Sequence, residues 1–148
     1  MVERKEKTIK GKSGVVFAIV QKGKILLEER LNPKMKHYGF TIIPSGGVEK
    51  GESLLNTLER EIEEEYGCLP KISYYLSAHT QRDGNIVHER YLFLVTEVTG
   101  IIKNREPEKS KHLWVNFEEA RNICKHPFTQ EFLDVLENFL SEEELEGD

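Results

Sequence analysis

The sequence has little of what marks secreted or membrane-spanning proteins. Its 148 residues include two cysteines, Cys68 and Cys124, which are too few and too far apart for a disulfide framework or a paired-cysteine metal site. The longest uninterrupted apolar run, residues 15–20, is far shorter than the roughly 20 residues that cross a bilayer. Residues 1–12 mix Lys, Arg and Glu and lack the apolar stretch of a signal peptide. We therefore expect a cytoplasmic protein with no membrane segment, in which both cysteines are packing residues.

An excess of positive charge is also lacking. The chain carries 26 Asp and Glu against 21 Lys and Arg, a formal net charge of -5. Binding to nucleic acid through a broad basic face depends on neutralising phosphates, so no nucleic-acid partner is expected, and only a local basic pocket is compatible with this balance. No internal repeat and no Pro- or Ser-rich linker divides the chain. We predict a single domain over residues 1–148, with flexible ends at 1–12 and 141–148.

Short apolar and alternating segments predict a sheet interrupted by helices. A Gly-containing connection at 21–23 and a turn at 82–85 each predict a hairpin. The strongest helical periodicity lies at 53–66, where Ser53 suits the N-cap and Gly67 the left-handed position after the last turn. The order predicts a mixed sheet with helices packed on it, an α/β or α+β domain. The expected strands are 14–20, 24–30, 40–43, 71–80 and 87–95, with short ones at 101–102 and 113–115, and the expected helices are 53–66, 117–124 and 129–140.

Three glutamates within the helix at 53–66 are candidates for a metal site. Glu61 and Glu65 are four positions apart, so they share one face at the edge of the apolar stripe, and Glu64 is adjacent. Like charges this close repel one another, and if partly buried they need a cation. Oxygen ligands of this kind favour Mg²⁺, Mn²⁺ or Ca²⁺ over zinc. The alternative is an ordinary solvated acidic face, which is the commoner meaning of a charge run.

The residues around these glutamates decide between the two interpretations. They form the pattern G-x5-E-x7-R-E-U-x-E-E-x-G-U, where U is a bulky apolar residue, from Gly46 through Glu52 and Arg60 to Gly67 and Cys68. This pattern resembles the signature of the Nudix (MutT-like) hydrolase family. Cys68 is smaller than the usual last residue of the signature.

The resemblance extends to the flanks and implies a fold and a cofactor. Arg30 ends the second strand, Pro44 precedes the glycines, and Ser45 stands where the family usually has the first of two glycines. The implied fold is an α/β/α sandwich with a mixed sheet and a loop–helix–loop catalytic motif. The implied cofactor is Mg²⁺ or Mn²⁺, held by Glu61, Glu64, Glu65 and the backbone carbonyl of Ser45, while Gly46, Glu52, Arg60 and Gly67 have structural roles.

The resemblance leaves the general base open between Glu61 on the helix and Glu108 on a later loop. Glu106, the other acid of that loop, is separated from Glu108 only by Pro107. Arg30 is the favoured phosphate contact. Weaker options for it are Lys34, Lys36, Arg82 and Arg90.

The resemblance implies hydrolysis of a nucleoside diphosphate linked to another moiety. Residues 82–86 contain neither the proline typical of ADP-ribose hydrolases nor the tyrosine typical of dinucleoside polyphosphate hydrolases. A (d)NTP of the 8-oxo-dGTP type is therefore the first substrate expectation, with ADP-ribose, nucleotide sugars and dinucleoside polyphosphates as alternatives. A non-catalytic nucleotide-binding sensor is the alternative from another class, but the intact acids of the signature speak against it. The only expected partner is a small-molecule nucleotide, and a homodimer is left open.

Overall fold

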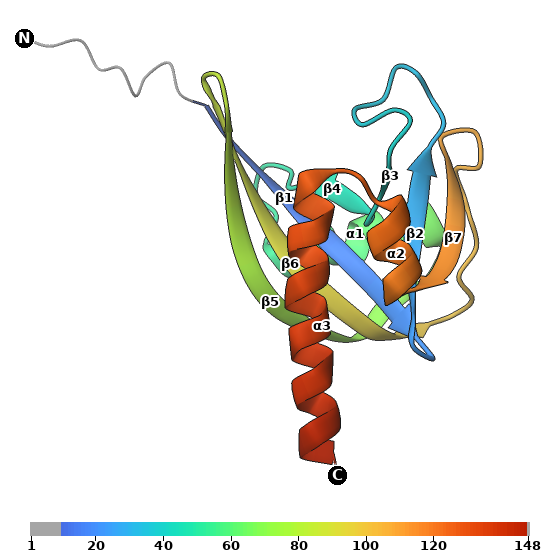
Figure 1. The fold of residues 1–148 in the computed structure, drawn as a ribbon. Coiled ribbons are helices and arrows are strands. Elements are labelled where there is room, and N and C mark those ends of the chain that lie inside the picture. Colours follow the sequence, from blue (N-terminus) through green and yellow to red (C-terminus); the bar gives the residue numbers. More distant parts are fainter. Residues whose placement is uncertain (1–9, 148) are drawn as a thin grey trace, which may run out of the picture.

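A mixed sheet organises the molecule, and its strands arise from the alternating and apolar segments of the sequence (Figure 1). The computed structural model describes residues 10–147 and, within them, the side chains of residues 11–142 except that of Asp83. The strand order is β3-β2-β1-β6-β5, with β4 paired to β1 and β7 paired to β2. The strands are β1 (Lys10–Gln21), β2 (Lys24–Arg30), β3 (Thr41–Ile42), β4 (Ser45–Gly47), β5 (Leu69–Asp83), β6 (Ile86–Thr99) and β7 (Ser110–Asn116).

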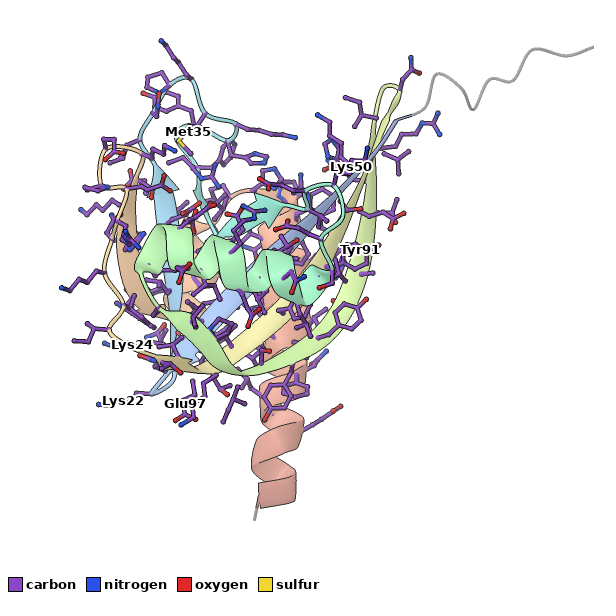
Figure 2. All side chains as sticks on the ribbon, turned by 180° about the vertical axis from the view of Figure 1, so that it is seen from behind. Lys22, Lys24, Met35, Lys50, Tyr91 and Glu97 are labelled. Atoms are coloured by element: carbon purple, nitrogen blue, oxygen red, sulfur yellow. The ribbon has the colours of Figure 1, made fainter. Side chains whose placement is uncertain are left out.

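Helices cover both faces of the sheet. They are α1 (Leu54–Tyr66), α2 (Phe117–Ile123) and α3 (Pro127–Gly147). Helices α2 and α3 lie in front of the sheet in Figure 1, and α1 lies in front when the molecule is seen from behind in Figure 2. The predicted α/β sandwich with a mixed sheet is confirmed.

Strand β1 contributes to two separate cores because its alternate side chains point to opposite faces. Residues 15, 17 and 19 pack with Leu58 and Ile62 of α1. Residues 16, 18 and 20 pack with Leu133 and Leu136 of α3. The strand pairs in parallel with β6, and antiparallel with both β2 and β4. The two cores are therefore joined through a single buried strand.

The hairpins β1–β2 and β5–β6 are confirmed, but the short strand expected at residues 101–102 is wrong. Gly100, with a φ of 101°, ends β6 in the left-handed region. The backbone N–H of Lys103 then donates to the carbonyl of Tyr66 at 3.0 Å. The segment is thus tied to the C-terminal end of α1 rather than to a strand.

The structure describes part of both chain ends. Residues 10–12 belong to β1, since their pairing with β6 begins at Lys10 opposite Ile86. Residues 141–147 continue α3, in a segment rich in the helix formers Glu and Leu. Residues 1–9 and 148 lie outside the described residues. Both cysteines are buried and free, as expected. Among the described residues, none of the helices is long and apolar enough to cross a bilayer.

Candidate active site

Helix α1 is fixed at both ends by the residues that the sequence indicated. The Ser53 side chain accepts a hydrogen bond from the backbone N–H of Asn56, and Gly67 has a φ of 70°. The N–H of Gly67 donates to the carbonyl of Glu63 at 2.9 Å. Because the apolar side of the helix is buried against β1, the acidic side is held toward β4 and the cleft described below.

Glu61 is in close contact with Gly46 of β4. A Cβ atom added to Gly46 would lie 2.0 Å from Cδ of Glu61, which no real side chain could occupy. The Glu61 side chain is 13% exposed, and burial raises its pKa although Arg60 opposes the shift. Glycine at position 46 is therefore required for the close approach of helix and strand.

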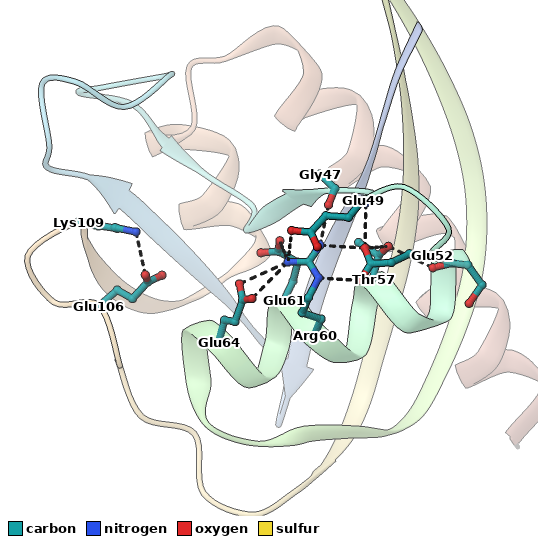
Figure 3. A network of polar contacts seen from close by, with 10 residues as sticks. Gly47, Glu49, Glu52, Thr57, Arg60, Glu61, Glu64, Glu106 and Lys109 are labelled. Atoms are coloured by element: carbon teal, nitrogen blue, oxygen red, sulfur yellow. Dashed lines mark hydrogen bonds and ion pairs between the residues drawn. The ribbon is translucent and has the colours of Figure 1, made fainter.

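Arg60 connects α1 to the glycine-rich segment, as Figure 3 shows. Its Nε donates to Glu52 at 2.7 Å and its Nη2 to the carbonyl of Gly47 at 2.8 Å. Its Nη1 donates to Glu61 at 2.9 Å and to Glu64 at 3.3 Å. One guanidinium thus holds the loop and two of the three candidate carboxylate ligands.

Glu52 is the best satisfied carboxylate of this network. In addition to Arg60, it accepts hydrogen bonds from the backbone N–H of Glu49 and the hydroxyl of Thr57, both at 2.9 Å (Figure 3). The Arg60 hydrogen bond, followed by that from Glu49, lowers the pKa of Glu52 to about 2. Glu52 therefore braces the loop as an anion.

Glu65, unlike Glu52, has an oxygen without a hydrogen-bond partner in the described part of the chain. This atom, Oε2, is buried. Burial, and then the charges of Glu28 and Glu61, raise the pKa of Glu65 to about 9. A buried carboxylate without a partner is costly, so this position calls for a cation.

Glu28 of β2 is a buried acid that the sequence prediction did not include. It is 1% exposed, and its Oε1 accepts a hydrogen bond from Nε of Arg30 at 2.6 Å. Burial raises its pKa despite Arg30. Strand periodicity could have indicated it, because Glu28 and Arg30 are two positions apart and share a face. Arg30 is therefore largely committed to Glu28, and it also lines the cleft.

The hydroxyl of Tyr66 is a second buried polar atom without a hydrogen-bond partner among the described residues. The ring is fully buried and lies 4.7 Å from that of His112, centroid to centroid. Burial raises the pKa of Tyr66, and the charges of Glu65 and Glu28 add to the shift. Tyr66 thus belongs to the same carboxylate-rich region.

The candidate metal ligands lie near one another, but their side chains do not converge on a common point. Among the side chains that the structure describes, no three His, Cys, Asp or Glu groups are arranged to hold a metal ion. Glu64 is 55% exposed and, like Glu61, is bound to Arg60. Ser45 lies in β4 opposite Val16, next to Gly46 and thus near Glu61.

The loop before β7 places its two acids differently. The charge of Glu106 raises the pKa of Glu28, Glu61 and Glu65, so this residue faces the carboxylates. Its Oε2 accepts a hydrogen bond from Nζ of Lys109 at 2.9 Å (Figure 3). Glu108 is exposed and contributes no comparable charge to the group. The loop acid that the structure brings to the candidate site is Glu106, whereas the sequence favoured Glu108.

A cleft of about 770 Å³ lies beside this group. It is bordered by the glycine-rich segment from Ser45 to Glu52 and by parts of β1, β2 and β6. Two of the weaker phosphate candidates, Lys36 and Arg90, line it together with Arg30, whereas Lys34 and Arg82 do not. The cleft therefore provides basic side chains next to a carboxylate-rich helix.

Comparison with known proteins agrees with this arrangement. Residues 11–136 match the model of the NUDIX domain family. The CTP pyrophosphohydrolase of Escherichia coli is 30% identical over 86% of this chain and 90% of its own length. The ADP-ribose pyrophosphatase of Methanocaldococcus jannaschii is 31% identical over 78% of this chain and 67% of its own. The match to Nudix hydrolase 4 of Arabidopsis thaliana, at 27% identity over 66% of this chain, spans about half of that relative, 48%.

A solved structure shows the same fold. The E. coli ORF135 protein superimposes with a TM-score of 0.77 at 23% identity, covering 92% of this chain and 95% of that one. At this identity the likeness establishes the architecture alone.

Proposed function

Because the chain belongs to the Nudix domain family of MutT-like hydrolases, we propose that it cleaves a phosphoanhydride bond in a nucleoside diphosphate linked to another moiety. The cofactor we propose is Mg²⁺ or Mn²⁺. The observation that carries this proposal is Glu65, a buried carboxylate with an unpartnered oxygen and two further buried acids close by. Such a group has little value as packing and is suited to binding a cation.

The proposed ligands are Glu61, Glu64, Glu65 and the backbone carbonyl of Ser45. All are oxygen donors, which suits Mg²⁺ and Mn²⁺. When bound, a divalent ion would lower the pKa of a water molecule and neutralise charge on the diphosphate. Arg60 holds Glu61 and Glu64 in the absence of an ion, so it keeps both carboxylates oriented toward the site.

The other residues have distinct roles in this proposal. Glu61 or Glu108 accepts a proton from the attacking water, and the position of Glu106 adds it as a third candidate. Arg30 binds phosphate from the cleft while Glu28 fixes its Nε. Gly46, Glu52, Arg60 and Gly67 maintain the loop–helix–loop geometry.

For the substrate we propose a (d)NTP of the 8-oxo-dGTP type. The E. coli relative is named for a nucleoside triphosphate and is covered over nine-tenths of its length, which supports a triphosphate. The M. jannaschii relative is named for ADP-ribose, so ADP-ribose is the next candidate. Nucleotide sugars and dinucleoside polyphosphates follow.

The test is a panel of these four classes assayed for product formation with Mg²⁺ and with Mn²⁺. We expect metal-dependent cleavage that chelation with EDTA abolishes. The Glu65→Gln variant is the negative control, because it keeps the size of the side chain and removes its charge. Turnover that is unaffected by EDTA, or no turnover of any compound, would refute the proposal.

A further inference from the structure

Arg90 of β6 lies at one end of a row of residues that leads to the glycine-rich segment. Strand register places it opposite Gly14 of β1, and Gly14 opposite Gly47 of β4. Two inter-strand spacings put the Cα atoms of Arg90 and Gly47 about 10 Å apart. Because the two glycines have no side chains, the surface between Arg90 and β4 is bare backbone.

The side chain of Arg90 is on the face of the sheet opposite α1. Leu92, two positions on, packs in the core with α3, and alternate residues of a strand share a face. On β5 its neighbour is His79, which is bound to Glu131 of α3 at 3.0 Å. Arg90 lines both the large cleft and a smaller adjoining pocket that includes His126 and Phe128. The cleft thus extends from the glycine-rich segment, which borders Glu61 at Gly46, to Arg90.

The Arg90 guanidinium is half-buried, and within the described part of the chain no carboxylate or carbonyl accepts a hydrogen bond from it. Burial lowers its pKa. The pKa of neighbouring His37 falls to about 4, through burial and then through the charges of His126, Lys36, Arg90 and Arg30. This part of the cleft therefore has a positive potential.

The lining of the cleft favours an anion over an apolar group. Its basic members are Lys12, Arg30, Lys36, Lys50 and Arg90, and its only aliphatic side chain is that of Val48. Of its acids, Glu52 is held by Arg60 and Glu89 accepts a hydrogen bond from Tyr91, both away from Arg90. Glu49 lies 3.7 Å from Arg60. A phosphate would find here several basic side chains and the guanidinium of Arg90.

We propose that Arg90 binds a phosphate group of the substrate that is separate from the diphosphate being cleaved. This rests on the proposed function, which places the cleaved diphosphate beside Glu61 and Glu65. The substrate class is then a compound with at least one phosphate outside the cleaved linkage, a condition that a nucleoside triphosphate meets. Arginine suits this role because its planar fork forms two parallel hydrogen bonds to phosphate oxygens.

The experiment measures binding without turnover. Isothermal titration calorimetry in EDTA compares inositol hexakisphosphate, a phosphate-rich probe, with ADP, which has one diphosphate. We expect the wild type to bind the hexakisphosphate more tightly than ADP. Arg90→Gln should weaken hexakisphosphate binding at least tenfold and ADP binding less than twofold, with Arg90→Lys in between. A melting curve for each variant establishes that it is folded.

Arg82→Gln is the matched control, because it removes the same charge from the exposed hairpin and should change either affinity less than twofold. No measurable binding of the hexakisphosphate, an unchanged affinity in Arg90→Gln, or an equal loss for ADP would overturn the proposal. Binding through Arg90 by a protein that hydrolyses no compound of the substrate panel would refute the proposed function and leave this subsite intact. Hydrolysis of a nucleotide together with unchanged hexakisphosphate binding in Arg90→Gln would support the proposed function and overturn the phosphate site at Arg90.

Discussion

The carboxylates around α1 and the basic side chains of the cleft have opposite imbalances of charge. Glu28 and Glu65 are buried with too little positive charge nearby, so their pKa values are raised. Burial lowers the pKa of Arg90, and burial followed by the charges of His126, Lys36, Arg90 and Arg30 lowers that of His37. Between them, Arg60 is the cation that holds Glu52, Glu61 and Glu64. This difference supports our proposals that one region receives a cation and the other an anion, which are the two requirements of metal-assisted phosphoanhydride cleavage.

The largest effect is expected from removing a charge in the cation-receiving region. Glu65→Gln and Glu64→Gln should each lower Mg²⁺-dependent hydrolysis by about 10³-fold, as removal of a main electrostatic contact typically does. The melting temperature of Glu65→Gln should not fall, because Gln has the size of the protonated carboxyl and the Oε2 atom it replaces has no hydrogen-bond partner in the described part of the chain. Glu59→Gln, on the exposed side of the same helix, is the control and should retain its activity. Near-normal turnover in both variants would remove the metal assignment.

A smaller loss is expected from Gly46→Ala. The added Cβ would overlap Glu61 and push its carboxylate away, so turnover should fall about 10²-fold, the usual cost of an ångström-scale misplacement. Gly47→Ala is the matched control, since nothing lies within 4 Å of the Cβ position there. Equal activity of the two variants would show that the position of Glu61 is not critical.

Arg60→Ala tests whether the hydrogen bonds of Arg60 stabilise the fold as well as the site. Loss of the guanidinium leaves Glu52 without its strongest partner and frees the carbonyl of Gly47, so the melting temperature should fall by several degrees. Hydrolysis should fall about tenfold, because Glu61 and Glu64 lose a common anchor. Thermal unfolding and steady-state rates measure both effects. An unchanged melting temperature would refute the bracing role.

The smallest effect concerns pH and the anion-receiving region. His37 has a pKa of about 4 in the folded protein and an ordinary value near 6.5 when unfolded. Between these values the unfolded chain binds more protons, so the free energy of unfolding decreases as the pH falls from about 6.5 to 4. His37→Asn, whose side chain tolerates the left-handed φ of 64° at this position, should reduce that decrease. Urea midpoints at pH 7 and pH 5 measure it, and identical shifts in both proteins would exclude His37 as a source.

Local patterns in the sequence predicted helix α1 and its caps because these depend on neighbouring residues. Ser53, Gly67 and the link from Arg60 to Glu52 lie within about 15 positions of one another. The same holds for the hairpins, whose turns are marked by glycine. Fold and motif were therefore predictable at the level of the family.

What could not be predicted depends on register and loop path. Glu28 joins the carboxylates only because β2 runs beside α1, and Arg90 joins the cleft only because β6 pairs in register with Gly14. Glu106 rather than Glu108 faces the site because the N–H of Arg105 donates to the carbonyl of Glu65 at 3.0 Å. Periodicity can place Glu28 and Arg30 on one face of β2, but no spacing along the sequence shows which distant residues that face meets.

Strand β1 also has a consequence for the way the molecule opens. Because its alternate side chains fill both cores, separating it from β6 would expose apolar surface on both sides at once. Amide protons along the middle of β1 should therefore exchange with solvent only through global unfolding, at one common rate, while those of the loop before β7 exchange through small local fluctuations. Strand β1 is thus the element that makes unfolding of the sandwich cooperative.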